Sequence, residues 1–394
     1  MARKKSGANR ALYIGQYNGL GVIPATSTPA MYLRNQSDSL DGTTEVLKSN
    51  ELLPGRATAE PQIGASSVGG GVPIEFSALS FDRLLAAVLM SNWVQDGTDP
   101  KIATLNAGSI SKKFWILKKF AESDYPMFQL YKKLVVDSFD LSLAVNALVT
   151  GNFAFMGVND PILETINPVT GLTVFPAALT TSAFTSRRGF LKVDAVTFTY
   201  AKELKFSLKN NNALLPALFV DESDTVEKMF DVTGSLSAYL SDEILFNKAV
   251  NGTKITIGVE VDDAAGNKYL IEFSNIKLES HSSAASGKVE LVQSYNWTAF
   301  GSVVVKITRS LVTAAPVFSL TYDGNTSTGG TVPPVVTKLE AGSVSYAAAN
   351  SGLLVKTGKV FSGWNTLATG LGDDYAVGTP VVVEVALTLY AKWV

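Results

Sequence analysis

The stretch that decides the fold of this chain is residues 72–90, which read VPIEFSALSFDRLLAAVLM. Val72, Ile74 and Phe76 alternate with other residues, which is typical of a strand with one buried face. The period then changes, because apolar residues at positions 81, 84, 85, 88 and 89 fall on one side of a helix. Ser80 precedes this run and is a candidate N-cap. The stretch therefore predicts a strand that passes directly into a short helix.

The same pattern returns at residues 232–250, which read VTGSLSAYLSDEILFNKAV. Alternation up to Leu240 gives way to a helical run from 241 to 250. Acidic residues in its first turn and Asn251-Gly252 after its end suit the helix dipole and a left-handed cap. Six elements follow one another in the same order around both stretches, although few residues are identical. The sequence therefore predicts an internal duplication, with copies at about 30–157 and 195–300.

Composition favours a mainly β protein of two or three domains. The 394 residues include 32 Gly and 15 Pro spread along the chain, and only 17% are charged. A length near 400 residues exceeds one ordinary hydrophobic core. Many short strands joined by turns fit this composition, and short helices flank them. The longest apolar runs are too short for a membrane helix, and the N-terminus has no signal-peptide core. We expect synthesis as a soluble protein in a cytoplasm.

Residues that could perform catalysis are scarce. Cysteine is absent, which excludes disulfides, thiolate metal sites and cysteine nucleophiles. The single histidine, His281, lies in a polar segment and is expected to be a solvated loop residue. The acid pairs Asp262-Asp263 and Asp373-Asp374 read as turn residues without a third ligand nearby. We therefore predict no catalytic residue, no metal, no cofactor and no enzymatic activity. A two-carboxylate carbohydrate-active enzyme is the alternative of this class.

The charge balance argues against a nucleic-acid-binding protein, because the formal net charge is −2 and no basic field covers the chain. Two interpretations are compatible with this value. The protein is an ordinary soluble one, or its surface lets DNA pass without gripping it, since phosphate neutralisation by Lys and Arg is what holds DNA.

The chain divides into five parts. Residues 1–157 form a first module with an N-terminal arm, 158–194 a linker, 195–310 a second module, 311–316 a hinge, and 317–394 a small β unit. A further stretch, residues 35–71, reads as irregular and ends in a glycine-rich run. Segments of this length without regular structure are usually functional or become ordered on binding.

The last part, residues 317–394, resembles the Listeria–Bacteroides repeat, a small β-grasp-like module of bacterial surface proteins. Four segments in order carry the resemblance: Leu320–Asn325, Gly329–Pro333, Phe361–Thr366 and Leu387–Trp393. The resemblance implies an exposed accessory module with a β-grasp or Ig-like fold and weak binding to host surfaces.

Residues 1–310 resemble the major tail tube proteins of long, non-contractile-tailed bacteriophages. The resembling segments are Ser49–Leu52, the strand leading into Leu79–Leu85, Thr150–Gly157 and Val232–Leu240. Pro54-Gly55 departs from the charged pattern expected after Glu51. The resemblance implies tandem β-sandwich or barrel modules, each with a flanking helix, whose inner sheets join around a ring.

What the resemblance implies for function is a structural protein of the virion. The chain would assemble into stacked rings that form the tail tube, the conduit for DNA ejection. Two modules per chain favour trimeric, pseudo-hexameric rings over hexameric ones. Expected partners are further copies, the tape measure protein, terminator and baseplate proteins, and genomic DNA passing without specific binding. Candidate inter-ring contacts are Asn50, Glu51, Arg56 and Glu60. The terminal module suggests a bacterial surface or secreted adhesin as the alternative.

Overall fold

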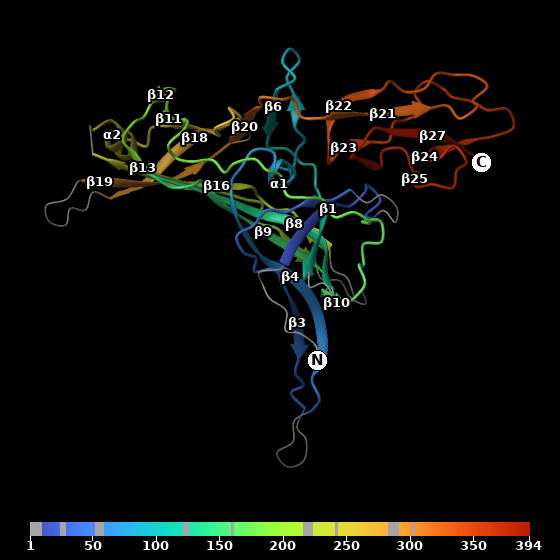
Figure 1. Ribbon diagram of the computed structural model, residues 1–394, viewed down its shortest axis with the longest axis horizontal. Coiled ribbons are helices and arrows are strands. Elements are labelled where there is room, and N and C mark those ends of the chain that lie inside the picture. Colours follow the sequence, from blue (N-terminus) through green and yellow to red (C-terminus); the bar gives the residue numbers. More distant parts are fainter. Residues whose placement is uncertain are drawn as a thin grey trace.

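A computed structural model gives the structure of the chain (Figure 1). It describes residues 10–23, 29–51, 59–120, 126–158, 161–215, 224–240, 243–282, 291–301 and 304–394. Strands dominate these ranges, and the two helices found there are short: α1 (Asp82–Val88) and α2 (Ile244–Val250). The prediction of a mainly β protein with short helices is therefore confirmed.

Seven strands of the first half pair in the order β2-β1-β7-β8-β9-β4-β3, and every pair is antiparallel. Two further strands, β5 and β6, follow α1, and β10 pairs with the first half of β8. The bounds are β1 (Arg10–Gln16), β2 (Met31–Tyr32), β3 (Asp41–Leu47), β4 (Gln62–Glu75), β5 (Val94–Gln95), β6 (Ile102–Asn106), β7 (Phe114–Phe120), β8 (Met127–Ala144), β9 (Thr150–Val158) and β10 (Ile162–Glu164).

Seven strands of the second half pair in the corresponding order, β12-β11-β17-β18-β19-β16-β13, again all antiparallel. A short hairpin, β14-β15, and a last strand, β20, complete this half. The bounds are β11 (Phe190–Val193), β12 (Val196–Thr197), β13 (Ala201–Lys209), β14 (Ala213–Leu215), β15 (Asp224–Val226), β16 (Asp231–Tyr239), β17 (Ile255–Asp262), β18 (Lys268–Ser282), β19 (Val292–Ala299) and β20 (Val305–Ser310).

The two halves also agree in register. β8 has a bulge between Val136 and Ser138 where it pairs with β9, and β18 has one between Leu278 and Ser280 where it pairs with β19. After β4, the backbone N–H of Phe76 donates to the carbonyl of Val149 at 2.9 Å. After β16, Leu240 donates to Leu291 at the same distance. Bulges re-aim a strand and interrupt its ladder, so their equal placement gives the halves the same geometry.

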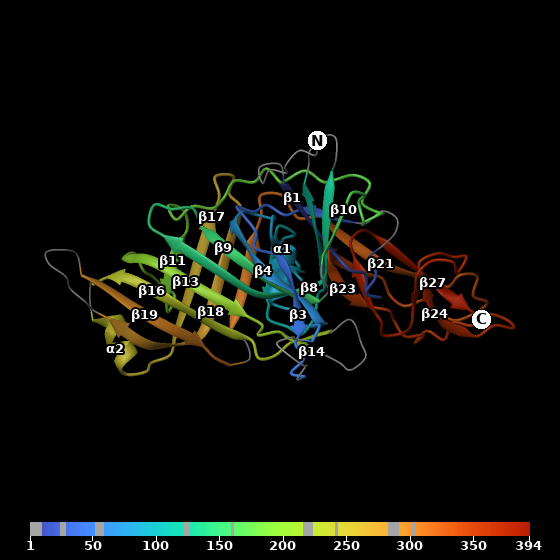
Figure 2. The ribbon, with the colours of Figure 1, turned by 90° about the horizontal axis from the view of Figure 1, so that it is seen from below.

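One strand pair joins the halves into a single sheet. The second half of β8 pairs with β13, from Ser138 opposite Lys209 to Ala144 opposite Glu203. The resulting order is β3-β4-β9-β8-β13-β16-β19-β18, and Figure 2 shows β9, β13, β16 and β19 side by side. A second layer runs β12-β11-β17-β18-β20-β6-β5, so the long β18 belongs to both layers.

The layers enclose one large apolar core to which both halves contribute. Its aromatic centre includes Phe76, Phe139, Phe153, Phe206 and Trp297, each at most 3% exposed. Burying a large aromatic side chain removes about 150–250 Å² from water. The two halves therefore stabilise each other and do not form separate cores.

Two local expectations from the sequence are wrong. Ser80 is not the N-cap of α1; the cap position is Phe81, without a side-chain hydrogen bond, and the Ser80 hydroxyl instead bonds the Ser77 hydroxyl at 2.9 Å. Residues 35–71 are not irregular, because β3 and most of β4 lie there and form a long hairpin that projects from the body (Figure 1). Glycines at 69–71 concealed this strand, and they are accommodated because β9 pairs along them.

The segment expected as a linker, residues 158–194, contains β10 and β11 and contributes to the core. Phe184 is fully buried, and its ring centroid lies 5.3 Å from that of Phe76 and 5.6 Å from that of Tyr269. This segment therefore fixes the two halves together besides connecting them.

Residues 317–394 form a compact β unit with its own core around Trp364 and Tyr322. A five-stranded sheet in the order β22-β21-β27-β24-β25 contains one parallel pair, β21-β27, and a separate pair is formed by β23 and β26. The bounds are β21 (Val317–Asp323), β22 (Val336–Glu340), β23 (Ser343–Tyr346), β24 (Phe361–Asn365), β25 (Asp374–Tyr375), β26 (Pro380–Val383) and β27 (Leu387–Trp393).

Candidate functional site

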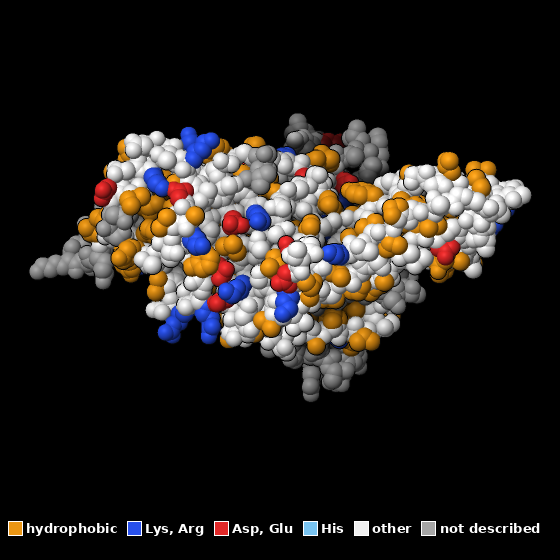
Figure 3. Space-filling view, turned by 90° about the horizontal axis from the view of Figure 1, so that it is seen from above, with side chains coloured by type: hydrophobic (Ala, Val, Ile, Leu, Met, Phe, Trp, Pro, Cys, Tyr) orange, Lys and Arg blue, Asp and Glu red, His pale blue; other side chains and the backbone are white. Residues whose placement is uncertain are grey.

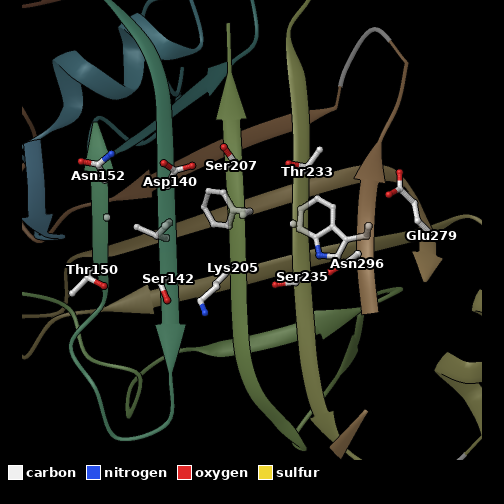
Figure 4. Close-up of a pocket in the computed structure, with 15 residues that line it drawn as sticks. Asp140, Ser142, Thr150, Asn152, Lys205, Ser207, Thr233, Ser235, Glu279 and Asn296 are labelled. Carbon is white, nitrogen blue, oxygen red and sulfur yellow. The ribbon is translucent and has the colours of Figure 1, made fainter. Parts of the chain in front are cut away.

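An open groove of about 700 Å³ lies on the face of the joined sheet that points away from the core (Figure 4). Strands β9, β8, β13, β16, β19 and the end of β18 line it. Because side chains alternate along a strand, the same strands that bury Phe139, Phe153 and Phe206 present polar residues on this side. These are Thr150, Asn152, Asp140, Ser142, Lys205, Ser207, Thr233, Ser235, Asn296 and Glu279.

The strand registers arrange these side chains in rows across the two halves. One row runs Asn152, Asp140, Ser207, Thr233, Thr298, and the next runs Thr150, Ser142, Lys205, Ser235, Asn296. Each row crosses the β8–β13 junction without a shift. The two halves therefore present one continuous surface, which we call the polar face.

Short, neutral side chains make up most of the polar face. Lys205 lines the groove and pairs with Glu203 at 2.7 Å between Nζ and Oε1, while Asp140 and Glu279 add negative charge. Lys209 and Lys277 lie next to these rows, opposite Ser138 and Thr298. Short hydroxyls and amides hold water well and offer little cationic charge to a phosphate backbone.

Among the residues that the structure describes, no group of three or more His, Cys, Asp or Glu side chains lies close enough to hold a metal ion. The same residues contain no helix that is long and apolar enough to cross a membrane. The backbone of His281 pairs with Tyr295 within the β18–β19 ladder, so this histidine is part of a strand and not of the expected loop.

Three of the four predicted inter-ring residues flank the strands of the projecting β3–β4 hairpin. Asn50, Glu51 and Glu60 are exposed near its end, while Arg56 lies outside the described residues. The structure therefore brings three of the four predicted residues together on one protrusion.

A second cluster of charges, which the sequence analysis missed, holds the C-terminal unit against the sheet body. Arg309 is 2% exposed, forms ion pairs with Asp82 of α1 and Glu340 of β22, and stacks 4.6 Å from the ring of Trp93. The Tyr269 hydroxyl donates to Asp82 at 2.6 Å. Burial raises the pKa of Glu340, although Arg309 opposes this, and the pKa of Tyr269 rises through burial and the charge of Asp82.

A neighbouring cluster extends this interface. Arg83 pairs with Glu384 at 2.7 Å, and Lys112 donates to Asn92 Oδ1 at 2.9 Å and to the carbonyl of Gly342 at 2.7 Å. Burial lowers the pKa of Lys112 to about 7 and raises that of Glu384. Leu311 and Ala315 of the expected hinge are also buried. Buried ion pairs therefore dock the C-terminal unit on α1.

The remaining surface carries both signs of charge. Figure 3 shows Lys and Arg interspersed with Asp and Glu over the upper face of the body, with apolar side chains between them. Such a mixture gives no field of a single sign that would attract nucleic acid.

Comparison with known families agrees with this architecture, which is a two-layered β body carrying a small β unit. Residues 7–299 match the phage tail tube protein family, and residues 318–392 match the Listeria-Bacteroides repeat domain. Since the first match spans most of the chain, the chain belongs to the phage tail tube protein family, a structural family of the phage tail. No curated protein matches the chain.

Proposed function

We propose that this protein assembles into stacked rings that form a phage tail tube, with the polar face lining the conduit for DNA ejection. The observation that carries the proposal is the β8–β13 pairing, which sets two units of equal topology side by side in one sheet. A tube wall needs such a repeat, because in a ring each unit presents one edge to the next unit and accepts the complementary edge of the unit before it. The modules expected at 1–157 and 195–310 remain part of this proposal, although the second unit includes β11 from the segment expected as a linker.

Ring closure follows from repeating this junction between chains. By register, the counterparts of Ser138–Asp140 in β8 are Ser280–Ser282 in β18, and the counterparts of Ser207–Lys209 in β13 are Asp41–Thr43 in β3. Among the described strands, β3 pairs with β4 alone, and Ser280–Ser282 pair with β19 alone. Pairing β18 of one copy with β3 of the next would satisfy both edges. Two units per chain then give three chains per ring.

The character of the polar face supports a conduit. Asp140 and Glu279 are acidic, and Lys205 is neutralised by Glu203. DNA moving past such a wall would release few counterions and so would bind weakly. Ejection requires weak binding, since a tube wall that bound the DNA phosphates tightly would prevent the DNA from moving through the tube.

Stacking and partner contacts complete the proposal. The β3–β4 hairpin, with Asn50, Glu51, Arg56 and Glu60, would reach the adjoining ring. Tape measure protein would occupy the lumen before DNA, and terminator and baseplate proteins would cap the tube. The C-terminal unit contacts α1 and β5, on the layer away from the polar face. It would therefore decorate the exterior, where it could bind host surfaces weakly.

Disulfide trapping tests the ring, and the absence of cysteine gives a clean background. Asp41→Cys with Ser282→Cys places thiols at the proposed junction between chains. Asp140→Cys with Ser207→Cys places them at the corresponding junction within one chain, where the two residues are directly opposed. Directly opposed strand residues have Cβ atoms about 4.5–5.5 Å apart, close to disulfide range.

Oxidised tubes of the first variant should yield covalent species of up to three chains, while the second variant stays monomeric on a denaturing gel. Covalent rings of six chains would contradict the trimer, and tubes without any link between chains would contradict the proposed edge pairing.

A further inference from the structure

A groove of about 480 Å³ opens where β8 ends and β13 begins. It lies between the joined sheet and the second layer, because residues of β8 and β13 line it together with residues of β11 and β17. Leu191 and Leu204 of its lining belong to the large core, and Leu143 and Phe198 pack against that core. Val145, which also lines the groove, is 53% exposed. The groove therefore gives access to the apolar edge of the core.

Basic side chains surround this apolar lining. Arg187, Arg188 and Lys202 line the groove and are exposed. None of the three is ion-paired with a carboxylate of a described residue, whereas the two acidic residues of the lining, Glu203 and Glu260, are each paired with a lysine. Complementary charge favours and orients contacts between protein surfaces. The groove is therefore suited to an apolar group that has acidic neighbours.

The projecting β3–β4 hairpin carries such a group. Val46 and Ile63 lie directly opposite each other on its two strands and are 53% and 80% exposed. Three exposed acidic residues lie on the outer part of the same hairpin: Glu45, Glu51 and Glu60. Lys48 is the one basic residue in the described part of the hairpin. Neighbouring apolar side chains that project into solvent indicate a surface that is covered on assembly.

Strand register places the hairpin and the groove at opposite ends of the joined sheet. β4 leaves the hairpin and ends at Glu75, which pairs with Thr150 of β9. Thr150 lies opposite Ser142 of β8, and Ala144 of the groove follows two residues further along the same strand. Figure 1 agrees, because the hairpin projects downward while β11, beside the groove, lies at the upper left of the body.

We infer that the β3–β4 hairpin of one copy inserts Val46 and Ile63 into this groove on a copy in the adjoining ring. The inference rests on the proposed stacking of rings and names the surface that receives the hairpin. Its acidic residues would then lie against Arg187, Arg188 and Lys202. A contact between two different surfaces of the same protein can repeat from copy to copy without closing. Stacking of rings into a long tube requires such a repeat.

Cross-linking in assembled tubes tests the contact. Ile63→Cys combined with Val145→Cys, treated with a short bismaleimide, should link chains of successive rings and give a ladder of more than three chains on a denaturing gel. Val46→Cys with Ile63→Cys, which are opposed within one hairpin, is the positive control and should stay monomeric. Ile63→Cys with Val360→Cys is the negative control, since Val360 is an exposed valine of the C-terminal unit. Tubes in which the test pair links no more than the negative control would overturn the inference.

Charge reversal gives a second readout. Arg187→Glu with Arg188→Glu should raise the critical concentration for tube formation several-fold and leave the melting temperature of the monomer unchanged, because both residues are exposed. Adding Glu51→Arg and Glu60→Arg should restore much of the loss. Lys359→Glu, at an exposed position of the C-terminal unit, should change neither quantity. An unchanged critical concentration in the arginine variant, or no recovery in the combined variant, would contradict the proposed contact.

The two levels of assembly can be told apart with the cysteine pairs. If Asp41→Cys/Ser282→Cys tubes cross-link while Ile63→Cys/Val145→Cys tubes do not, the ring stands and only the docking of the hairpin fails. If no tubes form, both the ring and the docking fail.

Discussion

Helices α1 and α2 follow equivalent strands, yet only α1 is buried. Six of the seven residues of α1 are buried, compared with Leu245 alone in α2. The last residue of each helix is valine, and Val88 is fully buried while Val250 is 59% exposed. The sequences alone do not explain this contrast, because both helices have apolar faces. The surroundings of the two helices differ: α1 is covered by the second unit and by the C-terminal unit, whereas the described residues provide no comparable cover for α2.

The two helices also differ in the charges at their starts. Asp82 begins α1 and meets Arg309 and Tyr269 from the second unit, whereas α2 begins with Ile244. An acidic residue in the first helical turn is common. Asp82 in addition binds Arg309 and Tyr269, and Arg309 in turn binds Glu340 of the C-terminal unit. The first unit is therefore the part of the molecule on which both the second unit and the C-terminal unit pack.

The largest expected effect on stability comes from removing the charge of Arg309, which joins the first unit, the second unit and the C-terminal unit. Arg309→Ala leaves the carboxylates of Asp82 and Glu340 buried without their partner, and should lower the free energy of unfolding by about 3–5 kcal/mol. Urea denaturation of the monomer measures this. Lys306→Ala is the control, because its ion pair with Glu272 is 3.8 Å long and half-exposed, and should change stability by less than about 0.5 kcal/mol. Equal effects would show that the interface around Arg309 does not stabilise the fold.

The helix comparison itself can be tested with one substitution at matched positions. Val88→Ala should destabilise the monomer by about 2–3 kcal/mol, since it removes buried methyl groups and leaves a cavity. Val250→Ala should stay within about 0.5 kcal/mol, as exposed substitutions usually do. Thermal unfolding of the two variants would settle the difference. Similar losses in both would mean that α2 is covered in the isolated chain.

A smaller, pH-dependent effect is expected from Lys112 at the interface with the C-terminal unit. Burial lowers its pKa to about 7, compared with roughly 10.4 for lysine in an unfolded chain. Between pH 7 and 10 the unfolded state therefore binds more protons, so this group makes the free energy of unfolding rise with pH, by up to ~1.4 kcal/mol per unit. Below pH 7 both states are protonated and the effect vanishes.

The Lys112→Met variant should lose this slope. Urea titrations at pH 7, 8 and 9 on wild type and variant isolate the contribution, because all other groups are shared. Parallel curves for the two proteins would mean that Lys112 titrates normally in the folded state.

Much of the architecture was predictable from local pattern. Alternation at Val72, Ile74 and Phe76 followed by a helical period predicts β4 and α1, and its return at residues 232–250 predicts β16 and α2. These signals are strong because they depend on which face of an element is apolar. The β3–β4 hairpin was missed, since glycines interrupt its alternation and only pairing with β9 specifies it as a strand.

The polar face could be predicted only in part. Polar residues recur at every second position, at Asp140 and Ser142 and at Lys205 and Ser207. This alternation indicates that one face of each strand is exposed to solvent. Nothing local indicates that these strands lie next to one another, because the four strands β9, β10, β11 and β12 separate β8 from β13 in the chain. Their register is set by the shared core beneath them, which buries Phe139 and Phe206 together.

The sequence by itself determined the class of the molecule: strand and helix periods, the repeated order, the absence of cysteine and the weak net charge all follow from residue identity. The tertiary structure decided where the units meet, which helix is covered, and that the C-terminal unit is docked through Arg309, Glu340 and Lys112. The physical reason is that periodicity reports which side of an element avoids water, whereas ion pairs and strand edges depend on residues far apart in the chain. Those partners become neighbours only when the core has formed.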